Sequence, residues 1–174
     1  MRVLIISDNH GEEQAITLVT KRETIDHIIH CGDFCTPEKA LPQRQRLTVV
    51  RGNCDFEEMA NDALWEGGGY RFFVTHGHRY RVNASLMKLA YRAAEGAADI
   101  VCFGHTHYPF CELHEGRLFI NPGSIVQPRG YTLPSYAILQ TSTNDSVHIT
   151  YYTPDGNNIS ELGGNYTLQQ GKNP

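Results

Sequence analysis

The sequence predicts an α/β protein in which two mixed β-sheets pack against each other and helices lie on their outer faces. Through residues 1–103, short apolar runs typical of strands alternate with segments that have helical periodicity. After that point, the patterned segments are all strand-like and are arranged as hairpins. Strand–helix alternation is typical of parallel units and hairpins of antiparallel pairs, so both sheets should be mixed.

Each element of the first half is predicted from its apolar pattern and from the residues that end it. The helix over residues 11–22 has an apolar stripe that ends at Val19, and the helix over residues 83–97 has leucines and alanines at helical spacing before it meets Gly96. Between the first two helices, residues 37–46 are predicted as a broken helical stretch. The strands of this half are predicted at residues 2–7, 26–31, 47–50, 63–65, 71–75 and 99–103.

The second half is predicted as two hairpins followed by a polar tail. The hairpins pair residues 110–114 with 117–121 and residues 135–141 with 146–152. Residues 153–174 are rich in Gly, Asn, Gln and Pro, which predicts either poor order or a contact in a homo-oligomer. A single folded domain is therefore expected over residues 1–152, with 153–174 as a polar C-terminal tail.

Composition and charge limit the classes of partner. No apolar run approaches the roughly 18 residues of a membrane-spanning helix, and the apolar start at residues 1–6 is predicted as a core strand rather than a signal peptide. We therefore expect a cytoplasmic protein without a membrane partner. The net charge of −4 and the scattered Lys and Arg residues show no basic stripe, so nucleic acid is not the expected partner. The five cysteines have no C-x-x-C pair, so no zinc–thiolate site is expected.

Five polar islands, each closing an apolar strand, are the most informative motif. In an open α/β sheet the carboxyl ends of parallel strands meet at one edge, where ligands bind. The islands supply two carboxylates, an amide and several imidazoles, which are ligands for borderline divalent metals. Together they predict a dinuclear metal site. The islands are Asp8-Asn9-His10, Gly32-Asp33, Gly52-Asn53-Cys54-Asp55, His76-Gly77-His78 and Gly104-His105-Thr106-His107.

In these islands the chain resembles the calcineurin-like metallophosphoesterases, whose pattern is D-x-H, G-D, G-N-[HC]-[DE], H and G-H-x-H. The G-N-C-D form, a later N-P-G-S at residues 121–124 and a P-R at residues 128–129 resemble the small bacterial and archaeal phosphodiesterases of the YfcE type. The resemblance covers residues 1–152. It implies an α/β/β/α sandwich, a layer order that periodicity alone does not give.

The resemblance also implies a ligand set and a chemistry. Asp33 would bridge two divalent transition-metal ions, and Asp55 would be a partner of a ligand imidazole. Mn²⁺ is the first expectation, with Ni²⁺, Fe²⁺, Co²⁺ or Zn²⁺ as alternatives, because a mixed O and N ligand set does not select by affinity alone. A metal-held hydroxide would attack a small phosphodiester. The remaining ligands would be Asp8, His10 and His107 for the first ion and Asn53, His76 and His105 for the second.

The catalytic residues implied beside the metals are Asn53, Cys54 and Asp55, with His78 as a further candidate. Many relatives have His where this chain has Cys54, and a thiol is a poorer proton donor than an imidazolium near pH 7. Cys54 is therefore either a weak general acid or a small filler residue. His78 is either a substrate contact or a polar loop residue, and Arg129 either a phosphoryl clamp or a surface charge.

Three functions remain open from the sequence. The resemblance implies a phosphodiesterase, and because the chain lacks the insertions that would build a deep specificity pocket, we expect a small, open site with broad substrates. A phosphomonoesterase or nucleotidase of the same family is the alternative within enzymes. A metal-binding scaffold with little activity, similar to the retromer subunit of this family, is the alternative from another class. Loss of metal ligands would favour the scaffold, and this chain retains all seven candidates.

Overall fold

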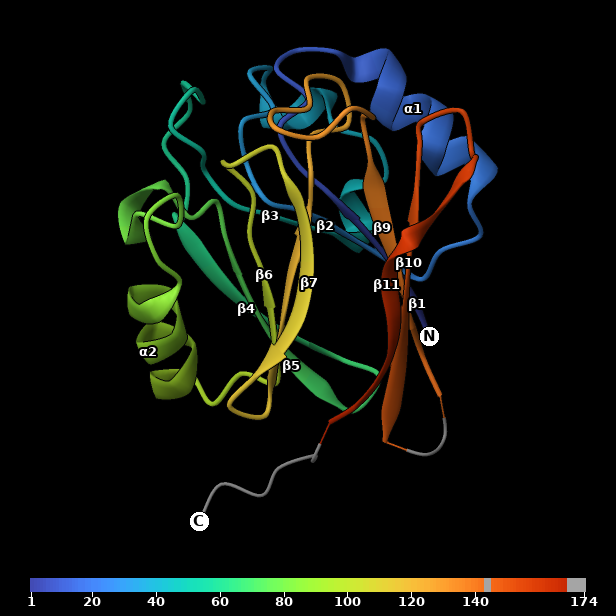
Figure 1. The fold of residues 1–174 in the computed structure, drawn as a ribbon. Helices are drawn as coiled ribbons and strands as arrows, with labels where there is room; N and C mark the ends of the chain where they lie inside the picture. The colour runs from blue at the N-terminus through green and yellow to red at the C-terminus, as the bar shows by residue number, and fades with distance from the viewer. Residues whose placement is uncertain (143–144, 169–174) are drawn as a thin grey trace.

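The computed structural model describes residues 1–142 and 145–168 and shows two β-sheets packed face to face (Figure 1). The first sheet has the strand order β11-β10-β9-β1-β2-β3, in which β1, β2 and β3 are parallel and the other neighbours are antiparallel. Its strands are β1 (Arg2–Ile6), β2 (His27–His30), β3 (Leu47–Val49), β9 (Tyr136–Thr141), β10 (Ser146–Tyr152) and β11 (Asn158–Thr167).

The second sheet has the order β4-β5-β6-β8-β7, with β5, β6 and β8 parallel and the two edge strands antiparallel. Both sheets are therefore mixed, as predicted. The strands of this sheet are β4 (Asp62–Gly67), β5 (Tyr70–Thr75), β6 (Ile100–Cys102), β7 (Pro109–His114) and β8 (Arg117–Pro122).

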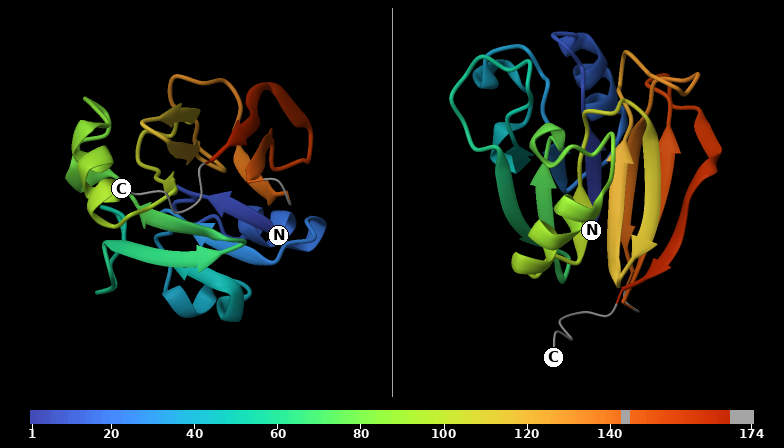
Figure 2. Two further views of the ribbon diagram at one scale, coloured as in Figure 1. Left: turned by 90° about the horizontal axis from the view of Figure 1, so that it is seen from below. Right: turned by 60° about the vertical axis from the view of Figure 1, so that its left-hand side comes forward.

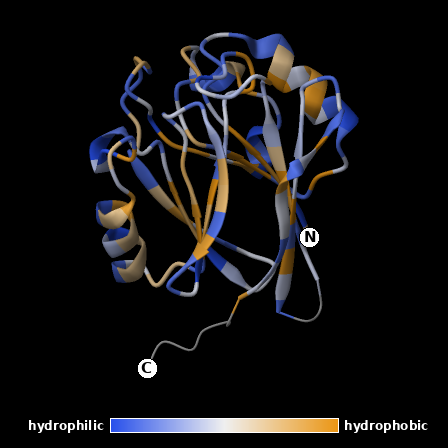
Figure 3. Cartoon of the chain, in the orientation of Figure 1, coloured by the Kyte–Doolittle hydropathy of each residue, from blue (hydrophilic) through white to orange (hydrophobic). Residues whose placement is uncertain are grey.

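Two helices cover the outer faces, so the layers are helix, sheet, sheet and helix (Figure 2). Helix α1 (Glu13–Arg22) buries Ile16 and Val19 against the first sheet. Helix α2 (Met87–Glu95) buries Leu89 and Ala93 against the second sheet. A third cluster fills the space between the sheets, where Figure 3 shows mainly hydrophobic strands. This arrangement confirms the α/β/β/α sandwich.

Two helical predictions differ from the structure. The broken stretch at residues 37–46 forms two short 3₁₀ turns, η1 (Glu38–Ala40) and η2 (Arg44–Arg46). The second helix begins at Met87, four residues later than predicted, because a turn at residues 81–84 precedes it and Ser85 Oγ accepts a hydrogen bond from the Met87 backbone amide. A hydroxyl that binds a nearby backbone amide favours a helix start over a helix interior.

The prediction of a poorly ordered tail is wrong for residues 158–168. Strand β11 pairs with β10, and Ile159 and Leu168 are only 2% and 1% exposed in the core between the sheets. Full burial of each such side chain is worth about 1.5–3 kcal/mol. Gly163 is required by close packing, since a Cβ there would lie 2.2 Å from the carbonyl oxygen of Ile149. Residues 169–174 of the predicted tail, and 143–144 of the predicted turn, lie outside the described residues.

Candidate metal centre

The carboxyl ends of the parallel strands from both sheets meet at one edge, the upper one in Figure 1. Two backbone hydrogen bonds join the loops there: the amide of Asp8 donates to Gly32 O at 3.1 Å, and the amide of Gly104 donates to His76 O at 3.1 Å. These bonds tie the loop after β1 to the loop after β2, and the loop after β6 to the loop after β5. They therefore place the first predicted island beside the second, and the fourth beside the fifth.

Five of the seven proposed ligands have a left-handed backbone, which non-glycine residues rarely adopt. Each such residue carries strain of roughly 1–3 kcal/mol, and strain of this kind is concentrated at functional sites. The surrounding packing must hold these side chains in place. The residues and their φ angles are Asp8 (55°), His10 (45°), Asp33 (55°), His105 (69°) and His107 (59°).

The first group of converging ligand atoms comes from Asp8, His10 and His107. Nε2 of His107 lies 3.2 Å from Oδ1 of Asp8 and 3.2 Å from Nε2 of His10. Nδ1 of His107 donates to the carbonyl oxygen of Gln127, so in the neutral ring Nε2 presents a lone pair. Among the described residues, Oδ1 of the fully buried Asp8 finds no hydrogen-bond partner. Lone pairs facing one another without a proton between them are suited to a cation.

The second group is built in the same way around His76. Its Nδ1 donates to the carbonyl oxygen of Cys31 at 2.7 Å, which leaves Nε2 facing Oδ1 of Asn53 at 3.1 Å and Oδ2 of Asp33 at 3.3 Å. The same Asp33 oxygen lies 4.0 Å from Nε2 of His10 in the first group. Asp33 therefore lies between the two groups, as a bridging ligand would.

Charges in the site favour a bound cation. Burial raises the pKa of Asp8, but contacts with His107 and His76 outweigh it, so the pKa lies below its usual range. For Asp33, burial is likewise outweighed by the bond to His76, and its pKa is also lowered. The pKa of His76 is raised because these carboxylates outweigh the effect of burial. Both carboxylates are ionised near neutral pH, and positive charge beside them is stabilised.

His105 and His78 border the second group. The half-buried ring of His105 lies 5.2 Å from that of His76, and the His105 amide donates to Oδ2 of Asp8 at 3.1 Å. The ring of His78 lies 5.3 Å from that of His76, and its Nδ1 has no hydrogen-bond partner within residues 1–142 and 145–168. Burial and the neighbouring imidazoles lower the pKa of both residues. His78 is therefore neutral near pH 7.

Asp55 has a different role from the one predicted. Its Oδ2 accepts from the backbone amides of Asp33 and Gly52 at 2.8 and 2.7 Å, and its Oδ1 accepts from the amide of Cys35 at 2.8 Å. The rings of His76 and His107 instead donate from Nδ1 to backbone carbonyls. The expectation that Asp55 would be a partner of a ligand imidazole is therefore wrong. Its buried carboxylate joins the loops that carry Asp33 and Asn53.

Two glycines of the islands are required by close packing and not by turn geometry. A Cβ on Gly52 would lie 2.1 Å from Oδ1 of Asp33, and a Cβ on Gly104 would lie 2.0 Å from Oγ of Ser7 and 2.8 Å from Oδ2 of Asp8. These contacts bring backbone directly against the two carboxylates. In both places a side chain would displace the carboxylate whose other oxygen faces the ligand imidazoles.

Sequence reasoning assigned no contact to several supporting residues, although it singled out the N-P-G-S segment at residues 121–124. Ser7 donates to Oδ2 of Asp8, and its only sequence signal is a hydroxyl at the end of an apolar strand. Asn121 donates to the carbonyl oxygen of Gly104 at 2.9 Å and so holds the last island. Ser124 donates to the carbonyl oxygen of Asp8 at 2.7 Å, which brings the N-P-G-S segment to the metal edge. Arg129 is exposed, and its backbone amide donates to the carbonyl oxygen of His107 at 3.4 Å.

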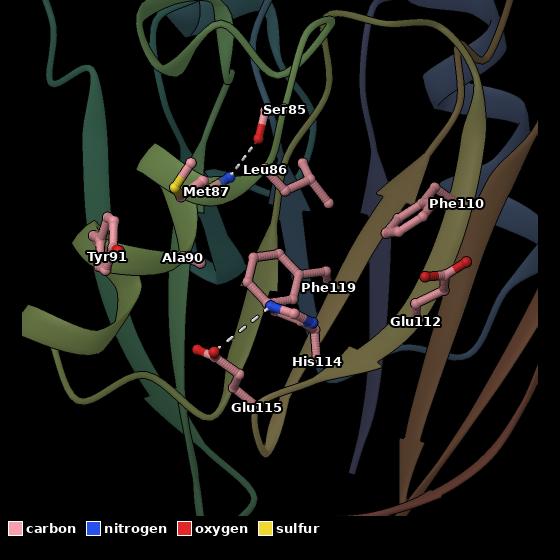
Figure 4. A pocket seen from close by; sticks show the side chains of 10 residues that line it. All are labelled: Ser85, Leu86, Met87, Ala90, Tyr91, Phe110, Glu112, His114, Glu115 and Phe119. Carbon is pink, nitrogen blue, oxygen red and sulfur yellow. Dashed lines mark hydrogen bonds and ion pairs between the residues drawn. The ribbon is translucent and has the colours of Figure 1, made fainter.

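A groove lies away from this edge, between α2 and the β7–β8 hairpin (Figure 4). It has a volume of about 400 Å³ and a largely apolar lining that includes Met87, Phe110 and Phe119. None of the proposed metal ligands lines it. The chemistry therefore belongs to the open edge and not to this groove.

Comparisons of sequence identify the family. A family model described as the calcineurin-like phosphoesterase superfamily domain matches residues 1–144. The probable metallophosphoesterase YsnB of Bacillus subtilis is 42% identical over 171 residues, which cover 97% of this chain and 100% of that protein. Phosphodiesterase YfcE of Escherichia coli is 29% identical over 168 residues, covering 80% of this chain and 87% of that protein. The chain belongs to the calcineurin-like phosphoesterase superfamily.

Solved structures agree with this assignment. An uncharacterized protein of Streptococcus pneumoniae, described as a predicted phosphoesterase, matches with a TM-score of 0.87 and 31% identity over 95% of this chain and 97% of that one. Vps29 of Entamoeba histolytica in complex with zinc matches with a TM-score of 0.72 over 95% of this chain and 97% of that one, but at 23% identity this shows the fold alone.

The family fixes the class of activity, and the donor set agrees with it. The protein is a hydrolase of phosphoesters, and its family implies divalent metal ions. The carboxylate, amide and imidazole atoms described above fit such ions, because they converge as lone pairs with an unpartnered buried oxygen among them. Within the described residues, no helix is long and apolar enough to span a membrane.

Proposed function

We propose that this chain is a metal-dependent phosphodiesterase that hydrolyses small phosphodiesters with two divalent transition-metal ions. The observation that carries the proposal is the pair of lone-pair groups on either side of Asp33, whose Oδ2 lies 3.3 Å from Nε2 of His76 and 4.0 Å from Nε2 of His10. A carboxylate between two such groups can bridge two cations and reduce their repulsion. Mn²⁺ is our first choice, with Ni²⁺, Fe²⁺, Co²⁺ and Zn²⁺ as the other candidates.

The residues divide between the ions as the family resemblance implies. Asp8, His10 and His107 would hold one ion, and Asn53, His76 and His105 the other, with Asp33 shared. When bound, two such ions supply an activated hydroxide near neutral pH and neutralise charge on the phosphoryl group. The backbone carbonyls behind His76 and His107 hold each ring with Nε2 toward the site.

Substrate size follows from shape and charge. The ligands lie at an open edge of the sheets, and the largely apolar groove of Figure 4 is elsewhere. With a net charge of −4, the chain has no excess of basic residues to hold a long nucleic acid. A small anionic diester needs only the local positive charge that two dications provide. These features support small phosphodiesters as the substrate class.

The two candidate general acids, Cys54 and His78, are both weak proton donors near pH 7. Burial and the carboxylates of Asp33 and Asp55 raise the pKa of the Cys54 thiol, so it keeps its proton near pH 7. His78 is neutral there and carries no proton beyond its single ring N–H. General acid help is typically worth about 10²- to 10⁴-fold. Diesters with activated aryl leaving groups should therefore react well, and alkyl phosphomonoesters poorly.

A substrate panel tests the proposal. Protein stripped of metal and reloaded with each candidate ion would be assayed on aryl diesters, cyclic nucleotides and alkyl monoesters. We expect Mn²⁺-loaded protein to hydrolyse the aryl diesters fastest. Faster turnover of monoesters would establish the nucleotidase alternative instead. Tight metal binding without turnover of any ester would establish the scaffold.

A further inference from the structure

The side-chain amide of Asn53 is held between two neighbours that require opposite ends of it. Its Oδ1 lies 3.1 Å from Nε2 of His76, and its Nδ2 donates to Sγ of Cys54 at 3.1 Å. A carboxamide has an acceptor at one end and a donor at the other, so reversing it exchanges these roles. Only the observed orientation presents an oxygen beside His76.

A neutral His76 ring does not oppose the reversed orientation. Because Nδ1 of His76 donates to Cys31, Nε2 of the neutral ring carries a lone pair. An amide N–H would satisfy that lone pair as well as any donor. A reversed Asn53 would then direct its N–H group, which cannot ligate a metal, into the place where a cation would bind. The orientation must therefore be set on the other side of the amide.

The backbone hydrogen bonds around Cys54 hold it firmly enough to fix the orientation of the Asn53 amide. The Cys54 backbone amide donates to Oδ1 of Asp33 at 2.8 Å, and the next residue, Asp55, accepts from the amides of Asp33 and Gly52. Its Sγ accepts from Nδ2 of Asn53 at 3.1 Å. The sulfur is therefore a fixed acceptor that faces the amide nitrogen.

We propose that Cys54 is a positioning residue that holds the Asn53 amide with Oδ1 directed toward the cation shared with His76 and Asp33. The inference rests on the proposed function only in taking Asn53 as a metal ligand. It gives the thiol a role that needs no proton transfer.

The test is Mn²⁺ affinity, measured on the full chain by competition with a chelating dye. Residues that orient a metal ligand typically contribute about 10- to 100-fold to affinity. We expect Cys54→Ala to lower the affinity for the Mn²⁺ ion at Asn53 and His76 by about that factor. The affinity for the ion at Asp8 and His10 should be unchanged. Cys54→Ser, whose hydroxyl also accepts from an amide, should restore most of the loss. Cys111→Ala removes a thiol from strand β7 and serves as the matched control.

A second background isolates the orientation itself. In Asn53→Asp both oxygens of residue 53 can ligate, so orientation no longer matters. Cys54→Ala should then have no effect on Mn²⁺ affinity in the Asn53→Asp protein. An equal loss in both backgrounds, or no loss in the Asn53 protein, would overturn the proposal. Since this readout needs no substrate, it can succeed where the phosphodiesterase assignment fails, and the reverse also holds.

Discussion

Oδ2 of Asp33 lies 3.3 Å from Nε2 of His76, and this contact joins the loop after β2 to the loop after β5. The two side chains therefore connect a loop of the first sheet to a loop of the second at the place where the ligand atoms converge. Because the backbone amide of Cys54 binds the other Asp33 oxygen at 2.8 Å, the orientation of the carboxylate is fixed before any metal binds.

Asp33→Asn should lose metal and at least about 10³-fold in phosphodiesterase rate. The amide keeps the shape of the carboxylate but removes the negative charge that two cations would share. Removing one preorganised electrostatic group typically lowers the rate by 10²- to 10³-fold, and Asp33 would serve two ions. The measurement pairs metal content by elemental analysis with the turnover of an aryl diester. Full metal content with normal turnover would exclude Asp33 as the bridge.

Gly104→Ala should impair metal binding more than it impairs folding. The new Cβ would meet Oγ of Ser7 and Oδ2 of Asp8, so the carboxylate must move. Gly96→Ala is the matched control, because its Cβ would meet Cδ2 of the half-exposed Leu64 at 3.3 Å. Mn²⁺ affinity and thermal unfolding would be measured for both. Equal Mn²⁺ affinity in the two variants would contradict the packing argument.

Acid should destabilise the metal-free protein through His30. This buried ring accepts from the Gly32 amide at Nδ1 and donates to Oδ1 of Asn9 from Nε2, so it is held neutral. Burial lowers its pKa from 6.5 to about 4. The folded pKa lies below the unfolded one, so the stabilisation is complete above pH 6.5 and is lost as pH falls from 6.5 toward 4.

At about 1.4 kcal/mol per pKa unit, the loss attributable to His30 is about 2 kcal/mol at pH 5. Urea unfolding at pH 7.5 and pH 5 would be compared in the natural protein and in His30→Gln. Other titrating groups are common to both proteins, so the difference between the two pH slopes isolates His30. Parallel slopes would show that His30 takes up a proton without unfolding.

Cys54→His should make the turnover of substrates with poor leaving groups rise more than that of aryl diesters. The imidazolium is a better general acid than a thiol near pH 7, but all three hydrogen bonds of Asp55 go to backbone amides, so no carboxylate orients the new ring. The gain should therefore stay below the usual 10²- to 10⁴-fold. The slope of log rate against leaving-group pKa is the readout. If the natural protein already has a shallow slope that the substitution leaves unchanged, His78 becomes the candidate acid.

Local pattern was enough to predict the strands and the convergence of the islands. Apolar runs bounded by polar residues placed β1, β2 and β5 within a residue or two, and parallel strands bring their carboxyl ends together by geometry. The metal edge was therefore predictable before the layer order was. The layer order itself came from the family resemblance.

What the sequence could not show depends on distant backbone. Gly163 suggests a flexible tail until its contact with Ile149 shows that only glycine fits an added strand. Asp55 suggests a partner for an imidazole until the amides of Asp33 and Cys35, about 20 positions away in the chain, occupy its oxygens. Neither contact produces a periodic pattern or a motif in the sequence, because each one joins a residue to peptide groups that are distant along the chain.

The central claim is that two divalent ions on one set of ligands are required for phosphodiester hydrolysis. The most direct measurement is turnover of an aryl diester by chelator-treated protein while Mn²⁺ is added back in measured steps, with bound metal counted in parallel. We predict no activity in the stripped protein, and recovery that is complete only as the second Mn²⁺ per chain binds. Full activity in the stripped protein, or full recovery with a single bound ion, would contradict the account.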